Sequence, residues 1–273
     1  MPRPPIDLTS HLNQDVTRGN LADFPVTLRP IYQSNQDRYA AIPKRQAVVR
    51  EDTGQVLAIV SDRYTLVPHQ RILELVEDAI GPLDVGAVPR GIYVDRQGAR
   101  MRALFKFPAL AQPVVNGDTL CPCLKIQNTY DKSSRIAIHV GAFRFVCTNL
   151  AVGGGGVFAG GFMAVHAGEV PITDVTKQLT SYLQGFERIV ALYRQWVLTD
   201  VGLETMDRVF AALSGRVETT LRAELPPTRR ATVWEAYNRA THFATHQMRS
   251  YRTAFDLLER VNRTFQERFP IQN

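Results

Sequence analysis

Apolar positions alternate in the first half of the chain and recur at helical spacing in the second. Residues 45–50 and 55–61 are strand-like runs separated by the acidic turn Glu-Asp-Thr-Gly, which predicts a β-hairpin. Pro68 then opens a stretch in which Ile72, Leu75, Val76 and Ala79 follow a helical period, and Gly81-Pro82 ends it. We therefore predict a helix directly after the hairpin.

Two further strands are predicted at about residues 88–95 and 99–107, joined by the turn Asp-Arg-Gln-Gly. In the second strand, basic residues alternate with apolar ones, which is typical of a half-buried strand with a basic solvent face. The basic set is Arg100, Arg102 and Lys106, and the apolar set is Met101, Ala103, Phe105 and Phe107. Residues 119–130 and 135–149, around a polar turn, predict another hairpin of long strands.

From about Ile172 the pattern is helical, with amphipathic segments at residues 172–197, 232–248 and 250–269. Strands followed by helices indicate an α+β fold, namely an antiparallel β-hairpin sheet with a packed helix, followed by a C-terminal helical half. We expect three regions. They are an N-terminal arm (1–40), a β-rich basic core domain (41–170), and a helical region (171–273) that packs on the core or on neighbouring subunits.

The composition is that of a globular protein, with 45% hydrophobic and 21% charged residues. No apolar run approaches the roughly 20 residues of a membrane helix, and the N-terminus lacks the apolar segment of a signal peptide. We therefore expect a cytoplasmic protein without membrane contact. Cys121, Cys123 and Cys147 are too few and too unevenly placed for a disulfide framework or a structural zinc site.

Positive charge is concentrated in one segment. Residues 88–148 hold nine Lys and Arg against three acids, and this excess of six equals the net charge of the whole chain, +6. Such a concentration favours a polyanionic partner, and a merely solvated basic face is the alternative.

Three other features suggest chemistry, and each has a simpler interpretation. The run Gly153–Gly156 resembles a phosphate-binding loop, but Val157 and Phe158 follow it where a Walker loop has Lys and Ser or Thr, so a flexible connector is favoured. Cys147 has no histidine nearby in sequence and shares the alternation of an apolar face, so it is interpreted as an inert core thiol. His242 and His246 have metal-binding spacing without a third ligand, so no metal or cofactor is predicted.

Two segments carry a family resemblance. Residues 56–80, VLAIVSDRYTLVPHQRILELVEDAI, and residues 124–154, LKIQNTYDKSSRIAIHVGAFRFVCTNLAVGG, resemble the phage/plasmid-like protein family, a domain of unknown function found on bacterial mobile elements. In the second segment, the matching residues include Asn128, Asp131, Arg144, Cys147 and Asn149. The resemblance implies a mobile-element protein. At fold level, a basic hairpin sheet with a packed helix is also similar to the core of phage single-strand annealing proteins of the Red-beta type.

The leading hypothesis is a non-enzymatic phage or plasmid DNA-binding protein that binds or anneals single-stranded DNA and forms a homo-oligomer. The expected nucleic-acid contacts are Arg100, Arg102, Lys106, Lys125, Lys132, Arg135 and Arg144, with Tyr130 as a base-stacking residue. One alternative is an enzyme acting on nucleotides or nucleic acid, with Cys147, Arg144 and Asn149 around the glycine-rich turn. The other is an interaction protein that inhibits a host defence system.

Overall fold

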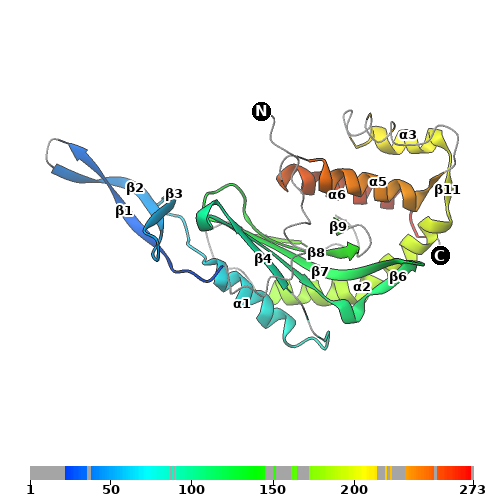
Figure 1. The fold of residues 1–273 in the computed structure, drawn as a ribbon, viewed down its shortest axis with the longest axis horizontal. Helices are drawn as coiled ribbons and strands as arrows, with labels where there is room; N and C mark the ends of the chain where they lie inside the picture. Colours follow the sequence, from blue (N-terminus) through cyan, green and yellow to red (C-terminus); the bar gives the residue numbers. More distant parts are fainter. Residues whose placement is uncertain are drawn as a thin grey trace.

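In the computed structural model, an arm of strands projects from a body made of a sheet and helices (Figure 1). The structure describes residues 22–35, 38–86, 88, 90–144, 150–151, 161–164, 172–213, 219, 222, 231–248 and 251–271. Antiparallel strands come first and helices follow, so the predicted α+β class is confirmed. No helix in these ranges is both long enough and apolar enough to cross a membrane.

The arm is a three-stranded antiparallel sheet of β1 (Val26–Asn35), β2 (Arg38–Arg50) and β3 (Gln55–Ser61). Its inner part is the predicted hairpin. Its outer part is a two-stranded ribbon, in which residues 32–35 pair with residues 38–41. Strand β1 lies within the segment that the sequence led us to expect as an N-terminal arm. The register jumps from the pair Pro30–Gln46 to the pair Tyr32–Ala41, so a bulge separates the inner and outer parts. Bulges bend and twist a ribbon, and the strands of the arm cross visibly in Figure 1.

Helix α1 (His69–Ile80) follows the arm, as predicted. Pro68 precedes its first residue and Gly81 caps its end. Its apolar stripe, including Ile72 and Val76, is buried in the core that it shares with the sheet.

The main sheet is antiparallel, with the strand order β10-β8-β7-β5-β4, and off this path β6 pairs with β7 and β9 pairs with β8. Its strands are β4 (Arg90–Asp95), β5 (Arg100–Lys106), β6 (Gln112–Val115), β7 (Asp118–Thr129), β8 (Ile136–Arg144), β9 (Leu150–Ala151) and β10 (Gly161–Ala164). Short 3-10 turns, η1 (Arg96–Gly98) and η2 (Pro108–Leu110), flank β5. The predicted hairpin at residues 88–107 is therefore present, and so is the one predicted at residues 119–149, as far as Arg144, after which residues 145–149 lie outside the described ranges.

The C-terminal part is helical, as expected, and includes one helix that the sequence pattern did not reveal. Its elements are α2 (Ile172–Leu198), β11 (Asp200–Val201), α3 (Leu203–Ala211), β12 (Ala231–Thr232), α5 (Val233–His246) and α6 (Tyr251–Arg268). Figure 1 shows α1 and α2 along one side of the sheet, and α5 and α6 on the other. Thr232 and Glu235 form a capping box that fixes the start of α5.

An aromatic cluster joins α2 to α5 and α6. Tyr193 lies within 5.0–5.2 Å of the rings of Trp196, Trp234 and Tyr237, and its hydroxyl hydrogen-bonds that of Tyr237 at 3.0 Å. The same apolar cluster continues through α1 and the strands of the sheet. The expected boundary near residue 170 is therefore crossed by a shared core, and the helical region packs on the sheet of its own chain.

Candidate functional site

The sheet brings the predicted basic residues of β5 onto one face. Arg100, Arg102 and Lys106 pair in register with Thr129, Gln127 and Cys123 of β7. Because directly paired residues project to the same side, Lys125 of β7 and its partner His139 of β8 belong to this face too. On the opposite face, Asn128 donates to the carbonyl of Val67 just before α1, so that side faces the helix. The alternation in the sequence therefore assigned these faces correctly.

This basic face is not the open surface that the sequence suggested. Arg102 is 8% exposed and its Nη1 lies 3.3 Å from Oδ2 of Asp95, while Lys125 is only 3% exposed. Arg100 is bound by Asp131, with 2.6 Å between Nε and Oδ2. Lys106 is half-buried. The expected exposure is therefore wrong at Arg102 and Lys125, and Arg100 already has a carboxylate partner.

Burial also reduces the positive charge of this face. Burial lowers the pKa of Lys125 well below its ordinary value, and the neighbouring charge of Arg102 lowers it further. Burial lowers the pKa of His139 to about 4, with a further decrease from Lys125. A lysine with this tendency to deprotonate is a poor phosphate ligand, so Lys125 is better described as a core residue.

Tyr130 is fully buried and therefore has no face available to a nucleic-acid base. Its ring stacks on His69 with 4.1 Å between centroids, and its hydroxyl accepts the backbone N–H of His69 at 2.8 Å. The ring of Phe24, at the start of the arm, lies edge-on to the ring of His69. The predicted stacking role is thus wrong, and Tyr130 instead joins the arm, α1 and the end of β7.

The turn between β7 and β8 presents two predicted residues to solvent. Asp131 accepts the N–H of Ser133 at 3.0 Å, and Thr129 exchanges hydrogen bonds with the backbone of Ser134, so the turn closes on its own side chains. Lys132 and Arg135 are both exposed on it. The side chain of Arg144 lies outside the described residues.

The turn between β4 and β5 lies against the base of the arm. Nη1 of Arg50 donates to the carbonyl of Gln97 at 3.0 Å, and the Arg50 guanidinium stacks 4.1 Å from the ring centroid of Phe24. Arg96 is exposed beside this contact. Its φ of 51° and the φ of 60° at Gln97 are left-handed, as a tight hairpin turn requires.

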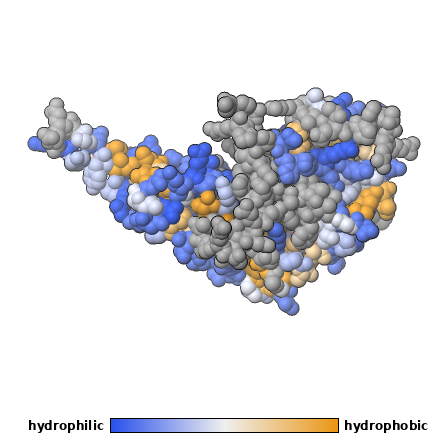
Figure 2. Space-filling model, viewed as in Figure 1, coloured by the Kyte–Doolittle hydropathy of each residue, from blue (hydrophilic) through white to orange (hydrophobic). Residues whose placement is uncertain are grey.

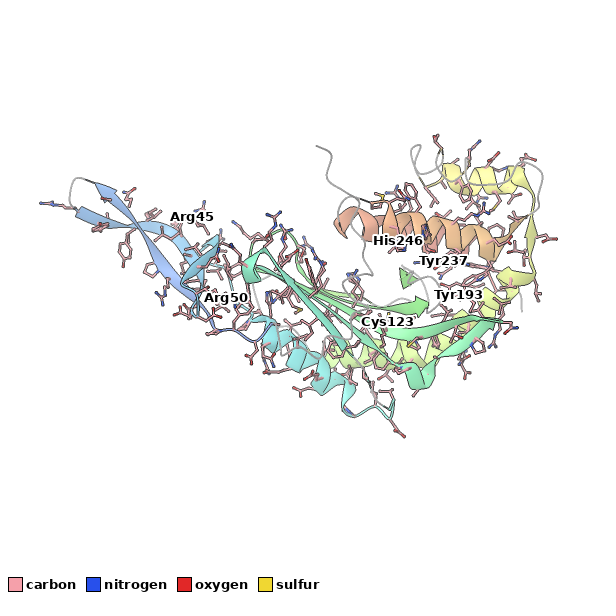
Figure 3. All side chains as sticks on the ribbon, in the orientation of Figure 1. Arg45, Arg50, Cys123, Tyr193, Tyr237 and His246 are labelled. Carbon is pink, nitrogen blue, oxygen red and sulfur yellow. The ribbon has the colours of Figure 1, made fainter. Side chains whose placement is uncertain are left out.

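Exposed cations gather at this end of the molecule, and we call this set the cationic edge. Its members share exposure to solvent and the absence, within the described ranges, of an ion pair: Lys44, Arg45, Arg63, Arg96, Lys132 and Arg135. Figure 3 shows Arg45 and Arg50 on the arm side of the molecule, far from Tyr193 and Tyr237. Figure 2 shows hydrophilic residues where the arm meets the body.

The acids near this edge are largely occupied by other arginines. Glu51 binds Arg29, Asp52 binds Arg50, Asp95 binds Arg102 and Asp131 binds Arg100. Asp62 is an exposed acid next to Arg63 and takes part in none of these four ion pairs, while six exposed cations lie in the same region. The edge therefore keeps a local excess of positive charge.

Sequence reasoning found only Lys132 and Arg135 of this set. None of the other four was among the expected contacts: Arg45 stood in the predicted hairpin, Arg96 in a predicted turn, and Lys44 and Arg63 just outside the hairpin. One signal was available at Lys44: Pro43 lacks an N–H and interrupts β2 at the bulge, which exposes the next residues.

The described residues give little support to the alternative chemical sites. Cys147, Asn149 and Gly153–Gly156 lie outside them. Cys121 and Cys123 are buried, and burial raises the pKa of the Cys121 thiol to about 11, which opposes a nucleophilic role. The rings of His242 and His246 are 4.5 Å apart, but no group of three side chains suited to a metal ion occurs in the described ranges.

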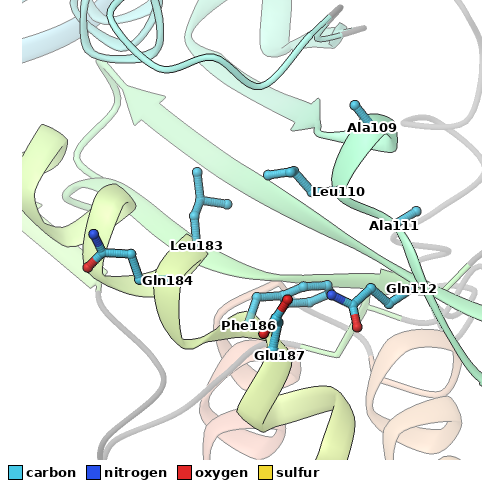
Figure 4. A pocket seen from close by; sticks show the side chains of 8 residues that line it. All are labelled: Ala109, Leu110, Ala111, Gln112, Leu183, Gln184, Phe186 and Glu187. Atoms are coloured by element: carbon cyan, nitrogen blue, oxygen red, sulfur yellow. The ribbon is translucent and has the colours of Figure 1, made fainter.

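A cavity of about 360 Å³ lies between η2, β6 and α2 (Figure 4). Leu110, Leu183 and Phe186 supply apolar contacts to it, and Glu187 is its charged side chain. Such a lining offers neither a nucleophile nor a phosphate-binding group, so we assign it no chemistry.

These features define an α+β protein with a projecting β-arm and a cationic edge at the base of that arm. The chain belongs to the family DUF932, described as a domain of unknown function, whose model matches residues 56–270. Comparisons with curated proteins and with solved structures found no significant match.

Proposed function

We propose that this chain is a non-enzymatic DNA-binding protein that holds single strands by their phosphates along the cationic edge. The observation that carries the proposal is the excess of exposed cations there: six Lys and Arg side chains on four segments, while four nearby carboxylates are bound to other arginines. Binding phosphates releases condensed counterions, so the affinity falls steeply with salt and depends little on base sequence.

Backbone geometry supports the same surface. Lys44, Arg96 and Lys132 hold φ values of 58°, 51° and 59°, in the left-handed region that costs L-residues about 1–2 kcal/mol each. Strained non-glycine positions tend to collect at functional sites. Three cations in this conformation at one end of the molecule therefore favour a role beyond folding.

The association with phage or plasmid DNA is also part of the proposal. The resemblance of residues 56–80 and 124–154 to phage/plasmid-like proteins is the basis for placing the protein on mobile DNA. An annealing role, a homo-oligomer and a cytoplasmic location are expected with it. The family match itself carries no activity.

A charge-matched pair of variants tests the proposal. The edge variant replaces Arg96, Lys132 and Arg135 with Ser, and the control variant replaces Lys177, Arg188 and Arg263, exposed on α2 and α6, with Ser. Both lose three positive charges. Fluorescence anisotropy with a labelled single-stranded 30-mer between 50 mM and 500 mM salt should give a slope of log affinity against log salt that is smaller by about 2 in the edge variant only.

Equal slopes in the two variants would show that net charge, not the cationic edge, governs binding. The alternatives give other patterns. A nucleic-acid enzyme would turn over its substrate and lose turnover in Cys147→Ser with its affinity intact. A host-defence inhibitor would show no salt-sensitive DNA affinity in the wild-type chain.

A further inference from the structure

Two tyrosines project from the outer ribbon of the arm. Tyr32 on β1 is 56% exposed and Tyr39 on β2 is 78% exposed, which is unusual for rings that bury 150–250 Å² in most folds. The ribbon consists of two strands at this point, and its described neighbours Gln33, Ser34 and Ala40 are exposed too. Both rings are therefore accessible to a binding partner.

The register places both rings on the same face of the ribbon. Tyr32 is paired with Ala41, and Tyr39 with Ser34, so the two tyrosines occupy diagonal positions on opposite strands. Diagonal neighbours in an antiparallel ribbon are about 7 Å apart. Two rings that leave one face of the ribbon this close together can each stack on a base of the same strand.

Positive charge accompanies the rings. β1 and β2 together carry Arg29, Arg38, Lys44, Arg45 and Arg50 and no acid, and Asp37 is the only acid in the sequence from Val26 to Arg50. Arg38 is exposed at the outer end of the ribbon, and Lys44 and Arg45 are exposed at its bulge. Aromatic rings flanked by cations along an extended ribbon are the arrangement that binds bases and phosphates of one strand together.

We propose that the arm is the element that selects single-stranded nucleic acid, with Tyr32 and Tyr39 stacking on its bases while Arg38, Lys44 and Arg45 hold the flanking phosphates. This inference rests on the proposed function and adds the source of strand selectivity. A duplex offers its base faces only to neighbouring bases, so the rings gain nothing from it. Every base has a π-face, so the site tolerates any sequence.

The test uses ring removal with a ring-retaining control. The stacking variant is Tyr32→Leu with Tyr39→Leu, and the control is Tyr32→Phe with Tyr39→Phe. Each full-length protein is titrated with three labelled 20-mers of equal length: oligo-dT, the same backbone with abasic sites throughout, and a duplex. Circular dichroism and thermal unfolding of each variant verify that the arm and body stay folded.

The stacking variant should lose about 10-fold to 100-fold in affinity for oligo-dT and nothing for the abasic strand or the duplex. Its salt slope should match that of the wild type, because no charge is removed. The phenylalanine control should stay within about 2-fold of the wild type, because its rings remain.

The outcomes separate this inference from the proposed function. If the wild type shows no salt-dependent affinity for any strand, the proposed function fails before the tyrosines are tested. If the wild type binds and the leucine variant binds oligo-dT equally well, or loses the abasic strand to the same extent, the stacking role is overturned. A change in molar mass by light scattering that explains the loss would assign the rings to contact with a second copy, which also overturns it.

Discussion

Replacing Lys44, Arg96 and Lys132 with glycine should separate binding from folding. All three hold positive φ, a conformation that glycine adopts without steric cost. Glycine removes about 1–2 kcal/mol of steric strain per position. Its greater conformational entropy in the unfolded chain costs about 0.5–1 kcal/mol in return. The free energy of unfolding should therefore stay the same or rise in each variant, measured by urea denaturation.

The affinity of the same triple variant for single-stranded DNA should fall. Each lost phosphate contact removes about 0.7 from the salt slope on a single strand, so the triple variant should lose about 2. At 0.1 M salt this corresponds to an affinity about 100-fold weaker, and the difference should disappear near 1 M salt. Anisotropy titrations across this range measure both quantities.

Gln97→Gly is the matched control, because Gln97 has the same left-handed backbone with a φ of 60° and carries no charge. It should match the change in unfolding free energy per position of the triple variant, less the hydrogen bond that Gln55 donates to the Gln97 side chain, and it should bind DNA like the wild type. Undiminished binding by the triple variant would refute the assignment of these cations as contacts. A fall in unfolding free energy of more than about 1 kcal/mol per position would instead mean that the side chains themselves hold the turns together.

Three further substitutions test interactions of buried polar side chains. Tyr130→Phe removes the hydroxyl that accepts the His69 N–H and should lower the unfolding free energy by about 1–2 kcal/mol in urea denaturation, with DNA affinity unchanged. Lys125→Met should raise stability at pH 7, because burial disfavours the charged ammonium; a lower melting temperature would contradict this. The depressed pKa of His139, about 4 against an ordinary 6.5, favours its neutral form in the folded state, so its contribution to stability is complete above pH 6.5 and is lost as the pH falls toward 4. His139→Gln should flatten the dependence of melting temperature on pH in that interval.

The regular elements were predictable because their patterns are local. The alternation in β5 assigned Arg100 and Met101 to opposite faces, and the period of α1 identified Ile72 and Val76 as buried. Proline and glycine marked the ends of α1 because both act through the backbone at their own position.

The burial and ion pairing of the basic face were not predictable, because they depend on contacts between residues far apart in the sequence. Arg102 meets Asp95 through the register of two strands, and Arg100 meets Asp131 across 31 residues. Tyr130 is buried in a cluster with Phe24, Val48 and Val60, and its hydroxyl accepts the backbone N–H of His69, 61 residues earlier. None of these contacts leaves a periodic signal in the sequence.

The outer arm was missed for a different physical reason. Both faces of its two-stranded ribbon are exposed, so polar and apolar residues do not alternate, and the periodicity that identifies a half-buried strand is missing. Tyr32 and Tyr39 then look like isolated aromatics in a polar segment. Only the strand register brings them to one face.

Ultraviolet cross-linking of the full-length protein to a single-stranded oligonucleotide, followed by mass spectrometry of the attached peptides, tests the central claim most directly. We expect cross-links in the arm between Tyr32 and Arg45 and in the turns that carry Arg96, Lys132 and Arg135. Cross-links confined to peptides of α2, α5 or α6, with none in the arm or these turns, would contradict it.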